Sequence, residues 1–147
     1  MNADKVRKFL KVAESFAAFS KDPSTKVGAV IVGPSGEVRS SGWNGAPRGC
    51  AADEDHRFLD RAEKLYWVAH AELNAITNAA RVGTPLEGCS IIVTHPPCCA
   101  CAISIVQAGI KAVYCPTPSD EFMSRWSEHI DRSNKLFSET NVGYLWI

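Results

Sequence analysis

The sequence predicts an α/β sandwich that forms a single domain over residues 1–147, and three observations support this prediction. Two apolar segments joined by a Gly-Pro-Ser-Gly turn near the N-terminus are typical of a β-hairpin. In the second half, short apolar segments alternate with longer ones, as they do where helices connect parallel strands. No internal repeat, low-complexity tract or linker interrupts the chain. One core is expected, because a chain of about this length buries roughly 70% of its unfolded surface.

The first elements follow from the spacing of apolar residues. A helix is predicted over residues 3–19, where apolar side chains recur every three or four positions, and Asn2 is its expected N-cap. Strands are predicted over residues 27–32 and 38–43; the first is almost continuously apolar, so it is expected inside the sheet. Residues 44–57 are rich in Gly, Pro and acidic residues and predict a long loop, which in a compact domain is often functional.

The second half is predicted to alternate helices with strands. Pro and Gly separate these segments, because neither residue continues a helix well. The predicted helices cover residues 71–80, 98–108 and 120–138, and the predicted strands cover residues 90–93, 112–114 and 142–147.

Composition narrows the class of partner. Sixteen basic residues balance sixteen acidic ones, whereas proteins that bind nucleic acid usually carry a basic excess. Nucleic acid is therefore not expected as a partner, whereas a single nucleotide, which needs only one or two basic groups, remains open. No apolar run is long enough to cross a membrane, and the charged N-terminus does not resemble a secretory signal. We accordingly expect a cytoplasmic protein, bacterial or viral in source, in which clustered cysteines bind metal or perform redox chemistry.

Two short motifs carry the chemistry: His-Ala-Glu at residues 70–72 and Pro-Cys-Cys-Ala-Cys at residues 97–101. Cys98 and Cys101 are three positions apart at a predicted helix start, so both lie on one face and can bind one ion. Cys99 lies about 100° around the helix and is not expected to be a ligand. With His70 they form a Cys₂His set that leaves one position open, as catalytic zinc sites do.

Because Glu72 is close in sequence to the metal ligand His70, the zinc site is predicted to be catalytic. Zinc lowers the pKa of a bound water from about 15.7 to about 7, and a neighbouring carboxylate can then move its proton. His-x-Glu together with Pro-Cys-x-x-Cys is a signature of zinc nucleobase deaminases. Three other interpretations stay open: a thioredoxin-like redox pair, a structural zinc whose fourth ligand is His95 or Cys99, and a noncatalytic zinc-binding module.

At these motifs the sequence resembles the cytidine and deoxycytidylate deaminase superfamily, and the deoxycytidylate branch in particular. The resemblance extends over nearly the whole chain, including residues 20–32, 42–49, 68–76 and 107–111. It implies a three-layer α/β/α fold with a central five-stranded mixed sheet flanked by helices. It also implies one catalytic Zn²⁺ and hydrolytic deamination of dCMP to dUMP and ammonia, which supplies dUMP for thymidylate synthesis. Glu72 is then the proton shuttle.

The resemblance also implies residues that bind the nucleotide. Asn44 is expected at the deoxyribose or its phosphate, the Ala71 backbone is expected to orient the nucleotide, and Lys26 is expected at the 5′-phosphate. Asn before Gly is also a common turn former, and Lys26 is equally compatible with an ordinary solvated lysine at a strand start.

Regulation and assembly are implied in the same way. Many relatives are activated by dCTP and inhibited by dTTP, and the segment that resembles their effector region contains Gly45, Pro47, Arg48 and Gly49. A homo-oligomer, with a hexamer favoured, is also expected.

Some positions depart from the family pattern. Trp43 replaces a usual tyrosine, and His95 stands where an aromatic or aliphatic residue is more frequent. A substrate other than dCMP therefore remains open: dCTP, a 5-substituted dCMP or a base within RNA. Cys50 and His56 raise the alternative of a second, structural zinc, although the loop before His70 is short for it.

Overall fold

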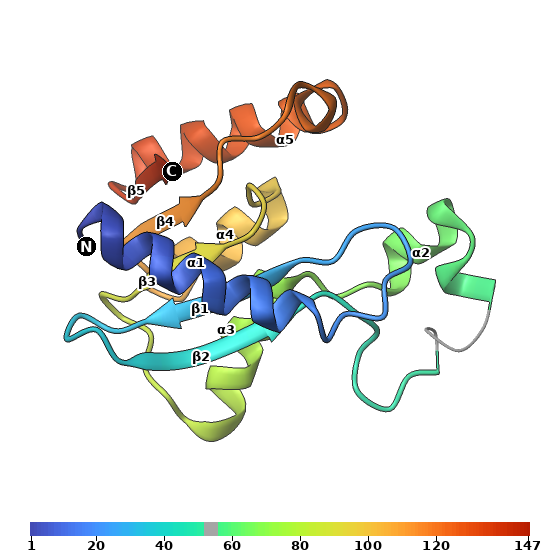
Figure 1. The fold of residues 1–147 in the computed structure, drawn as a ribbon, viewed down its shortest axis with the longest axis horizontal. Helices are drawn as coiled ribbons and strands as arrows, with labels where there is room; N and C mark the ends of the chain where they lie inside the picture. The colour runs from blue at the N-terminus through green and yellow to red at the C-terminus, as the bar shows by residue number, and fades with distance from the viewer. Residues whose placement is uncertain (52–55) are drawn as a thin grey trace.

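The computed structural model describes residues 1–51 and 56–147. In this part of the chain a five-stranded sheet lies between two layers of helices, as Figure 1 shows. The three-layer α/β/α architecture and the mixed five-stranded sheet that the resemblance implied are both confirmed. The strands, in the spatial order β2-β1-β3-β4-β5, are β2 (Val38–Trp43), β1 (Gly28–Val32), β3 (Ser90–Val93), β4 (Ala112–Cys115) and β5 (Gly143–Trp146).

The direction of the strands changes in the middle of the sheet. β1 pairs antiparallel with β2 on one side and with β3 on the other, whereas β3, β4 and β5 run parallel. All five residues of β1 are buried, which confirms the interior position predicted from its apolar run. The predicted hairpin and the parallel strands of the second half are likewise confirmed.

Helices cover both faces of the sheet and bury two apolar clusters. On one face, α1 packs with Val6 and Ala13 against Val30 and Ile92. The other face buries the larger cluster, in which Phe137 joins residues of α3, α4 and the strands. The covering helices are α1 (Ala3–Ala17) on the first face and, on the second, α3 (Ala71–Val82), α4 (Cys99–Gln107) and α5 (Asp120–Glu139).

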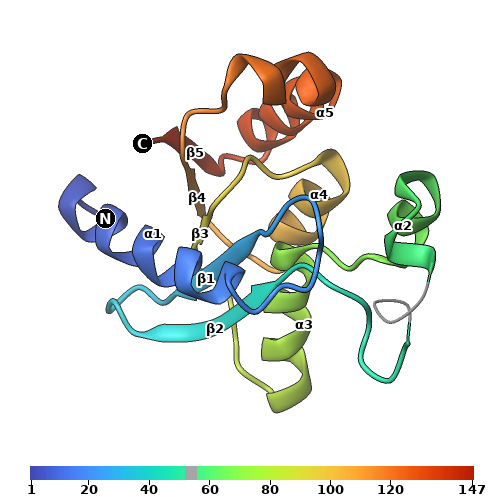
Figure 2. The same ribbon diagram turned by 45° about the vertical axis from the view of Figure 1, so that its right-hand side comes forward.

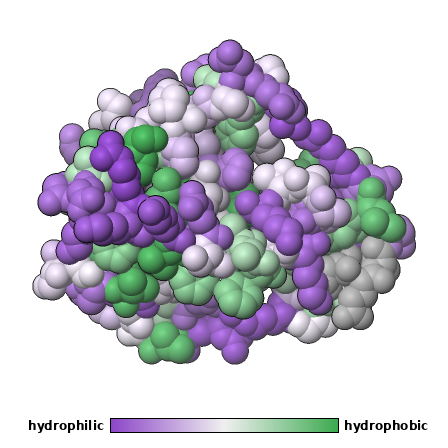
Figure 3. Space-filling view, in the orientation of Figure 1, coloured by the Kyte–Doolittle hydropathy of each residue, from purple (hydrophilic) through white to green (hydrophobic). Residues whose placement is uncertain are grey.

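α1 has the amphipathic form that the spacing predicted. Asn2 is its N-cap, because Asn2 Oδ1 accepts a hydrogen bond of 2.9 Å from the backbone N–H of Lys5. Its outward face is hydrophilic, as the space-filling view in Figure 3 shows. Gly28 of β1 allows the close approach of the inward face, since a Cβ there would collide with the carbonyl oxygen of Ala13.

α3 packs closely against β2. Ser40 Oγ donates to the carbonyl oxygen of Ala75 at 2.6 Å, and Asn74 Nδ2 donates to that of Trp43 at 2.7 Å. Gly42 permits this approach, because any Cβ at that position would meet the α3 backbone. The start of α3 is therefore fixed relative to the end of β2.

One helix was not predicted. α2 (Arg61–Trp67) follows a short 3₁₀ turn and stands apart at one side of the sheet, as Figures 1 and 2 show. It lacks an amphipathic pattern because Leu65 and Tyr66 are exposed, at 55% and 84%. The signal that identifies it is Asp60, whose carboxylate caps the N–H groups of Ala62 and Glu63.

The remaining differences are at the ends of elements. α1 ends at Ala17 instead of residue 19, and the last strand is shorter than residues 142–147. Residues 52–55 of the predicted loop lie outside the described part of the chain. Within the described part, no helix combines the length and the apolar character needed to span a bilayer.

Candidate active site

Two helix N-termini meet at one place. His70 is the N-cap of α3 and Cys98 is the N-cap of α4, and neither side chain caps its own helix. Cys101 lies one turn into α4 and points to the same place. Because the first N–H groups of a helix lack helical acceptors and carry partial positive charge, both ends favour thiolates.

The predicted ligand set is brought together by this arrangement. His70 Nδ1 lies 3.5 Å from Cys98 Sγ and 3.4 Å from Cys101 Sγ. The ligand atoms of the three residues all lie within 4.8 Å of one another. One imidazole and two thiolates at this spacing suit tetrahedral zinc with one position left open. Cys99 is outside the set, as predicted, and its backbone N–H donates to His129.

The ligands polarise one another. The pKa of Cys98 is lowered to about 4, first because the Cys101 thiol donates a hydrogen bond to its sulfur and also because of His70. The pKa of His70 is raised, chiefly by its hydrogen bond with Cys98. The site thus stabilises a thiolate, the form that binds a metal.

Glu72 is a buried carboxylate beside the ligands. It belongs to the first turn of α3 and is 4% exposed. Burial raises its pKa to about 7, and the positive charge of His70 partly opposes this effect. A carboxyl group in such surroundings is suited to accept and release a proton near neutral pH.

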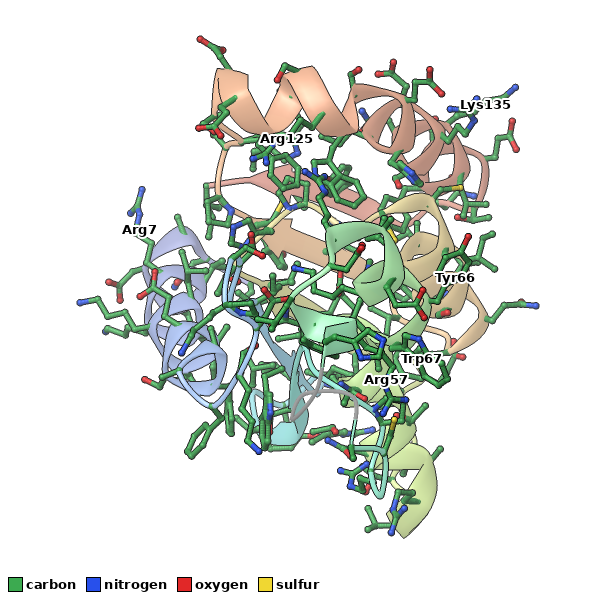
Figure 4. All side chains as sticks on the ribbon, turned by 90° about the vertical axis from the view of Figure 1, so that its right-hand side faces the viewer. Arg7, Arg57, Tyr66, Trp67, Arg125 and Lys135 are labelled. Carbon is green, nitrogen blue, oxygen red and sulfur yellow. The ribbon has the colours of Figure 1, made fainter. Side chains whose placement is uncertain are left out.

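These groups form one wall of a cavity of about 630 Å³. That volume lies in the range of pockets that hold a small organic ligand. α2 and α5 also contribute lining residues; Figure 4 shows both helices from the side of α2, with Arg125 on α5. The lining residues include His70, Ala71, Glu72 and Cys98 at the metal site, the rings of His95, Phe122 and Trp126, the cations Arg61, Lys64 and Arg125, and the polar residues Asp22, Ser24, Thr25 and Asn44.

The residues expected at the nucleotide are only partly brought together. Ala71 and Asn44 line the cavity. Lys26 is exposed and is not among the lining residues. Arg61 and Arg125 are cations of the wall that the sequence interpretation missed. A signal for Arg61 was available in the preceding N-cap, whereas Arg125 has none, since it looks like an ordinary surface residue of an amphipathic helix.

The segment expected to bind effectors lies elsewhere. Pro47, Arg48 and Gly49 line a second hollow of about 430 Å³, together with Lys21. Arg48 donates a hydrogen bond to Asn78 of α3. Gly45 does not line this hollow and instead forms a β-bridge with Ala69, just before the metal ligand His70.

The alternative of a second zinc finds no support in the described residues. Cys50 Sγ accepts a hydrogen bond of 3.8 Å from Arg57. Among these residues, the His70 set is the group of three possible ligands close enough to hold an ion.

Residues 3–117 match the family described as the cytidine and deoxycytidylate deaminase zinc-binding region. The chain belongs to this deaminase family. The match contains all three predicted ligands, so family and geometry agree on Zn²⁺ as the cofactor. They also agree on the hydrolase class of the deaminases.

Several relatives support the assignment to the deaminase family. An uncharacterized deaminase of Aliivibrio fischeri is 45% identical over 143 residues, which cover 96% of this chain and 92% of the relative. The human deoxycytidylate deaminase is 43% identical over 111 residues, and the match spans 71% of this chain but 60% of that protein. The dCMP deaminase of cyanophage S-TIM5, solved in complex with dCMP and dUMP, superposes with a TM-score of 0.77 at 29% identity. That superposition covers all of this chain and 99% of the phage protein.

Proposed function

We propose that this protein catalyses the hydrolytic deamination of dCMP to dUMP and ammonia. The observation that carries the proposal is the position of a buried carboxylate, Glu72, beside an open Cys₂His site in a cavity that also holds arginines. Deoxycytidylate deaminases among the relatives, and the phage enzyme solved with dCMP and dUMP, support the same substrate. The product dUMP is the precursor of thymidylate, which we propose as its use.

Each residue of the site is proposed to have a separate role in the reaction. Zinc, when bound by His70, Cys98 and Cys101, supplies the Lewis acid that activates water for attack on C4 of cytosine. Glu72 would accept one proton of the attacking water and pass it to the ring nitrogen N3. It would then accept the second proton, from the hydroxyl formed at C4, and pass it to the amine, so that the C4–N bond breaks, ammonia leaves and a C4 carbonyl remains. The backbone N–H of Ala71, at the first position of α3, has no helical acceptor and is free to donate to the carbonyl oxygen of the base.

Asn44 is proposed to orient the deoxyribose. Its Oδ1 accepts a hydrogen bond of 2.7 Å from Val27 N–H, and its Nδ2 donates to the carbonyl oxygen of Thr25 at 2.8 Å. A carbonyl oxygen accepts two hydrogen bonds, so Oδ1 retains one lone pair for a sugar hydroxyl. The Asn44 side chain thus stabilises the segment before β1 and is also proposed to contact the substrate.

The 5′-phosphate is proposed to lie toward Arg61 and Arg125. Both residues line the cavity, from α2 and α5 respectively, and guanidinium groups match the geometry of phosphate. Lys26, the residue expected from the resemblance, remains a candidate only if the phosphate extends beyond the described cavity wall.

Regulation is proposed at the second hollow. Arg48 and Lys21 line it, and a triphosphate such as dCTP or dTTP carries the negative charge that such groups attract. A homo-oligomer, with a hexamer favoured, and a cytoplasmic location are retained as proposals.

A deamination panel on the zinc-loaded protein tests the function. The loss of the 4-amino group is followed for dCMP, 5-methyl-dCMP, dCTP, deoxycytidine and a tRNA, with and without added dCTP and dTTP. Turnover that strongly favours dCMP supports the proposal, and a response to the triphosphates supports regulation. If the protein prefers 5-methyl-dCMP or dCTP, the proposed substrate is wrong but the proposed deamination mechanism is retained. If the zinc-loaded protein deaminates none of these substrates, the result favours the interpretation of the protein as a noncatalytic zinc-binding module.

A further inference from the structure

A buried lysine lies in the wall of the cavity without belonging to the metal site. Lys64 of α2 is 9% exposed, and its Nζ lies 3.0 Å from each carboxylate oxygen of Asp22 and 2.7 Å from Ser24 Oγ. We propose that Lys64 is a positioning residue for the nucleotide, because its ion pair with Asp22 docks α2 onto the segment 20–27. The proposal rests on the proposed function of the same cavity.

Lys64 is not itself available to bind phosphate. The Lys64 ammonium donates hydrogen bonds to Asp22 Oδ1 and Ser24 Oγ, and Asp22 Oδ2 lies 3.0 Å from Nζ in the same ion pair, so these groups surround the ammonium. The charge of Asp22, which is 3% exposed, neutralises that of Lys64. Attraction of a phosphate is therefore left to the arginines of the same cavity.

Asp22 is the centre of a network that shapes the segment before β1. Its carboxylate accepts hydrogen bonds from the backbone N–H groups of Ser24 and Thr25, at 2.8 and 3.0 Å, and from Ser24 Oγ at 3.0 Å. Removing Lys64 alone leaves this carboxylate as an uncompensated buried charge. The positions of Ser24 and Thr25 thus depend on the ion pair.

The network continues to the residue that we place at the sugar. Asn44 Nδ2 lies 3.4 Å from Asp22 Oδ2, and Ser20 Oγ donates to the carbonyl oxygen of Asn44 at 2.8 Å. Lys64, Asp22 and Asn44 all line the cavity. A shift of α2 is therefore expected to change the polar wall of the cavity. The zinc ligand His70 is held separately, because Ala69 forms a β-bridge with Gly45 and Asn74 of α3 donates to the carbonyl oxygen of Trp43.

Few apolar contacts offer an alternative way to hold α2. Leu65 and Tyr66 are exposed, and Figure 4 shows Tyr66 and Trp67 on the outer side of the helix. Arg57 stacks on Trp67, with its guanidinium carbon 4.6 Å from the ring centroid, which ties α2 to its own preceding turn rather than to the sheet. The buried ion pair is accordingly the strongest described link between α2 and the segment 20–27.

The test compares a charge-free pair with the wild-type protein. Asp22→Asn/Lys64→Met removes the ion pair without leaving a buried charge. We expect one zinc per chain, kcat close to wild type, a KM for dCMP raised about tenfold, and amide exchange of residues 61–67 about tenfold faster without nucleotide. The matched control is Asp4→Asn/Lys8→Met, which removes an exposed pair on α1 and is expected to change none of these values.

Two further variants separate positioning from folding. Lys64→Arg keeps the charge and is expected to restore most of the KM and of the exchange protection. Ser24→Ala removes the hydroxyl that accepts a hydrogen bond from Lys64, and it is expected to raise amide exchange in α2 about threefold even if the double variant does not fold.

The outcomes are distinct. Wild-type KM and wild-type exchange in the double variant overturn the proposal, and so does a fall in kcat and zinc content with KM unchanged. If the wild-type protein does not deaminate dCMP, the proposed function fails. The nucleotide-free amide exchange still decides whether Lys64 docks α2.

Discussion

Gly42 of β2 lies directly against Ala71, the first residue of α3: a Cβ on Gly42 would lie 2.5 Å from the carbonyl oxygen of Ala71. The metal ligand His70 and the carboxylate Glu72 flank Ala71 in the sequence. The close approach of the two backbones at Gly42, together with the hydrogen bonds between β2 and α3, thus sets the positions of His70 and Glu72.

Gly42→Ala is therefore expected to be costly. The new methyl group forces α3 away from β2, and such overpacking typically costs about 1–3 kcal/mol. We expect a lower free energy of unfolding in urea and a weaker affinity for zinc. Gly143→Ala is the control, because its Cβ meets only ordinary contacts at 3.4 Å or more. Equal stability of the two variants would contradict the argument.

Zinc content distinguishes the three cysteines of the motif. Cys98→Ser and Cys101→Ser are expected to lose zinc and stability, because metal binding contributes to folding. Cys99→Ser is expected to keep one zinc per chain, since Cys99 lies outside the ligand set. Metal analysis of the three purified variants checks this. A loss of zinc from Cys99→Ser would assign a fourth protein ligand and remove the open position.

Glu72→Gln is expected to bind zinc as the wild-type protein does and to lose turnover. An amide cannot accept the proton, and positioned proton transfer is typically worth about 10²–10⁴ in rate. The measurement is kcat on dCMP alongside zinc content. Glu14→Gln, on the exposed side of α1, is the control. If Glu72→Gln retained wild-type kcat, the proton would follow another route.

Arg125→Met separates the phosphate from the base. Hydrogen bonds to charged groups contribute about 1.5–3 kcal/mol, so kcat/KM for dCMP is expected to fall about 10- to 100-fold. Deoxycytidine, which lacks the phosphate, is expected to be unaffected. The matched control is Arg132→Met, because both arginines form i,i+4 ion pairs on α5. If Lys26→Met lowered kcat/KM for dCMP more than Arg125→Met does, Lys26 would be the residue that binds the phosphate.

The Asp22–Lys64 pair also predicts a dependence of stability on pH. Burial acts to raise the pKa of Asp22, but hydrogen bonds from Thr25, Ser24 and Lys64 together lower it below its ordinary value of 3.8. A lowered pKa gives stability that is complete above the ordinary value and is lost as the pH falls through the folded value. The difference in unfolding free energy between wild type and Asp22→Asn/Lys64→Met should therefore shrink below about pH 4. A difference that stays constant to about pH 3 would exclude this contribution.

The sequence by itself determined the chemistry and most of the fold. His70, Glu72, Cys98 and Cys101 are recognisable because short-range spacing at a helix start already places ligands on one face. The hairpin, the buried first strand and the parallel second half follow from apolar patterns, which report burial directly.

Only the tertiary structure decided what surrounds the metal. Arg61, Lys64 and Arg125 come from two helices far apart in the sequence, and no local pattern marks a surface arginine or a buried lysine as part of a cavity. α2 escaped prediction because an ion pair, rather than an apolar face, holds it. Contacts of this kind form between segments that are far apart in the sequence, so the spacing of residues within one segment cannot predict them.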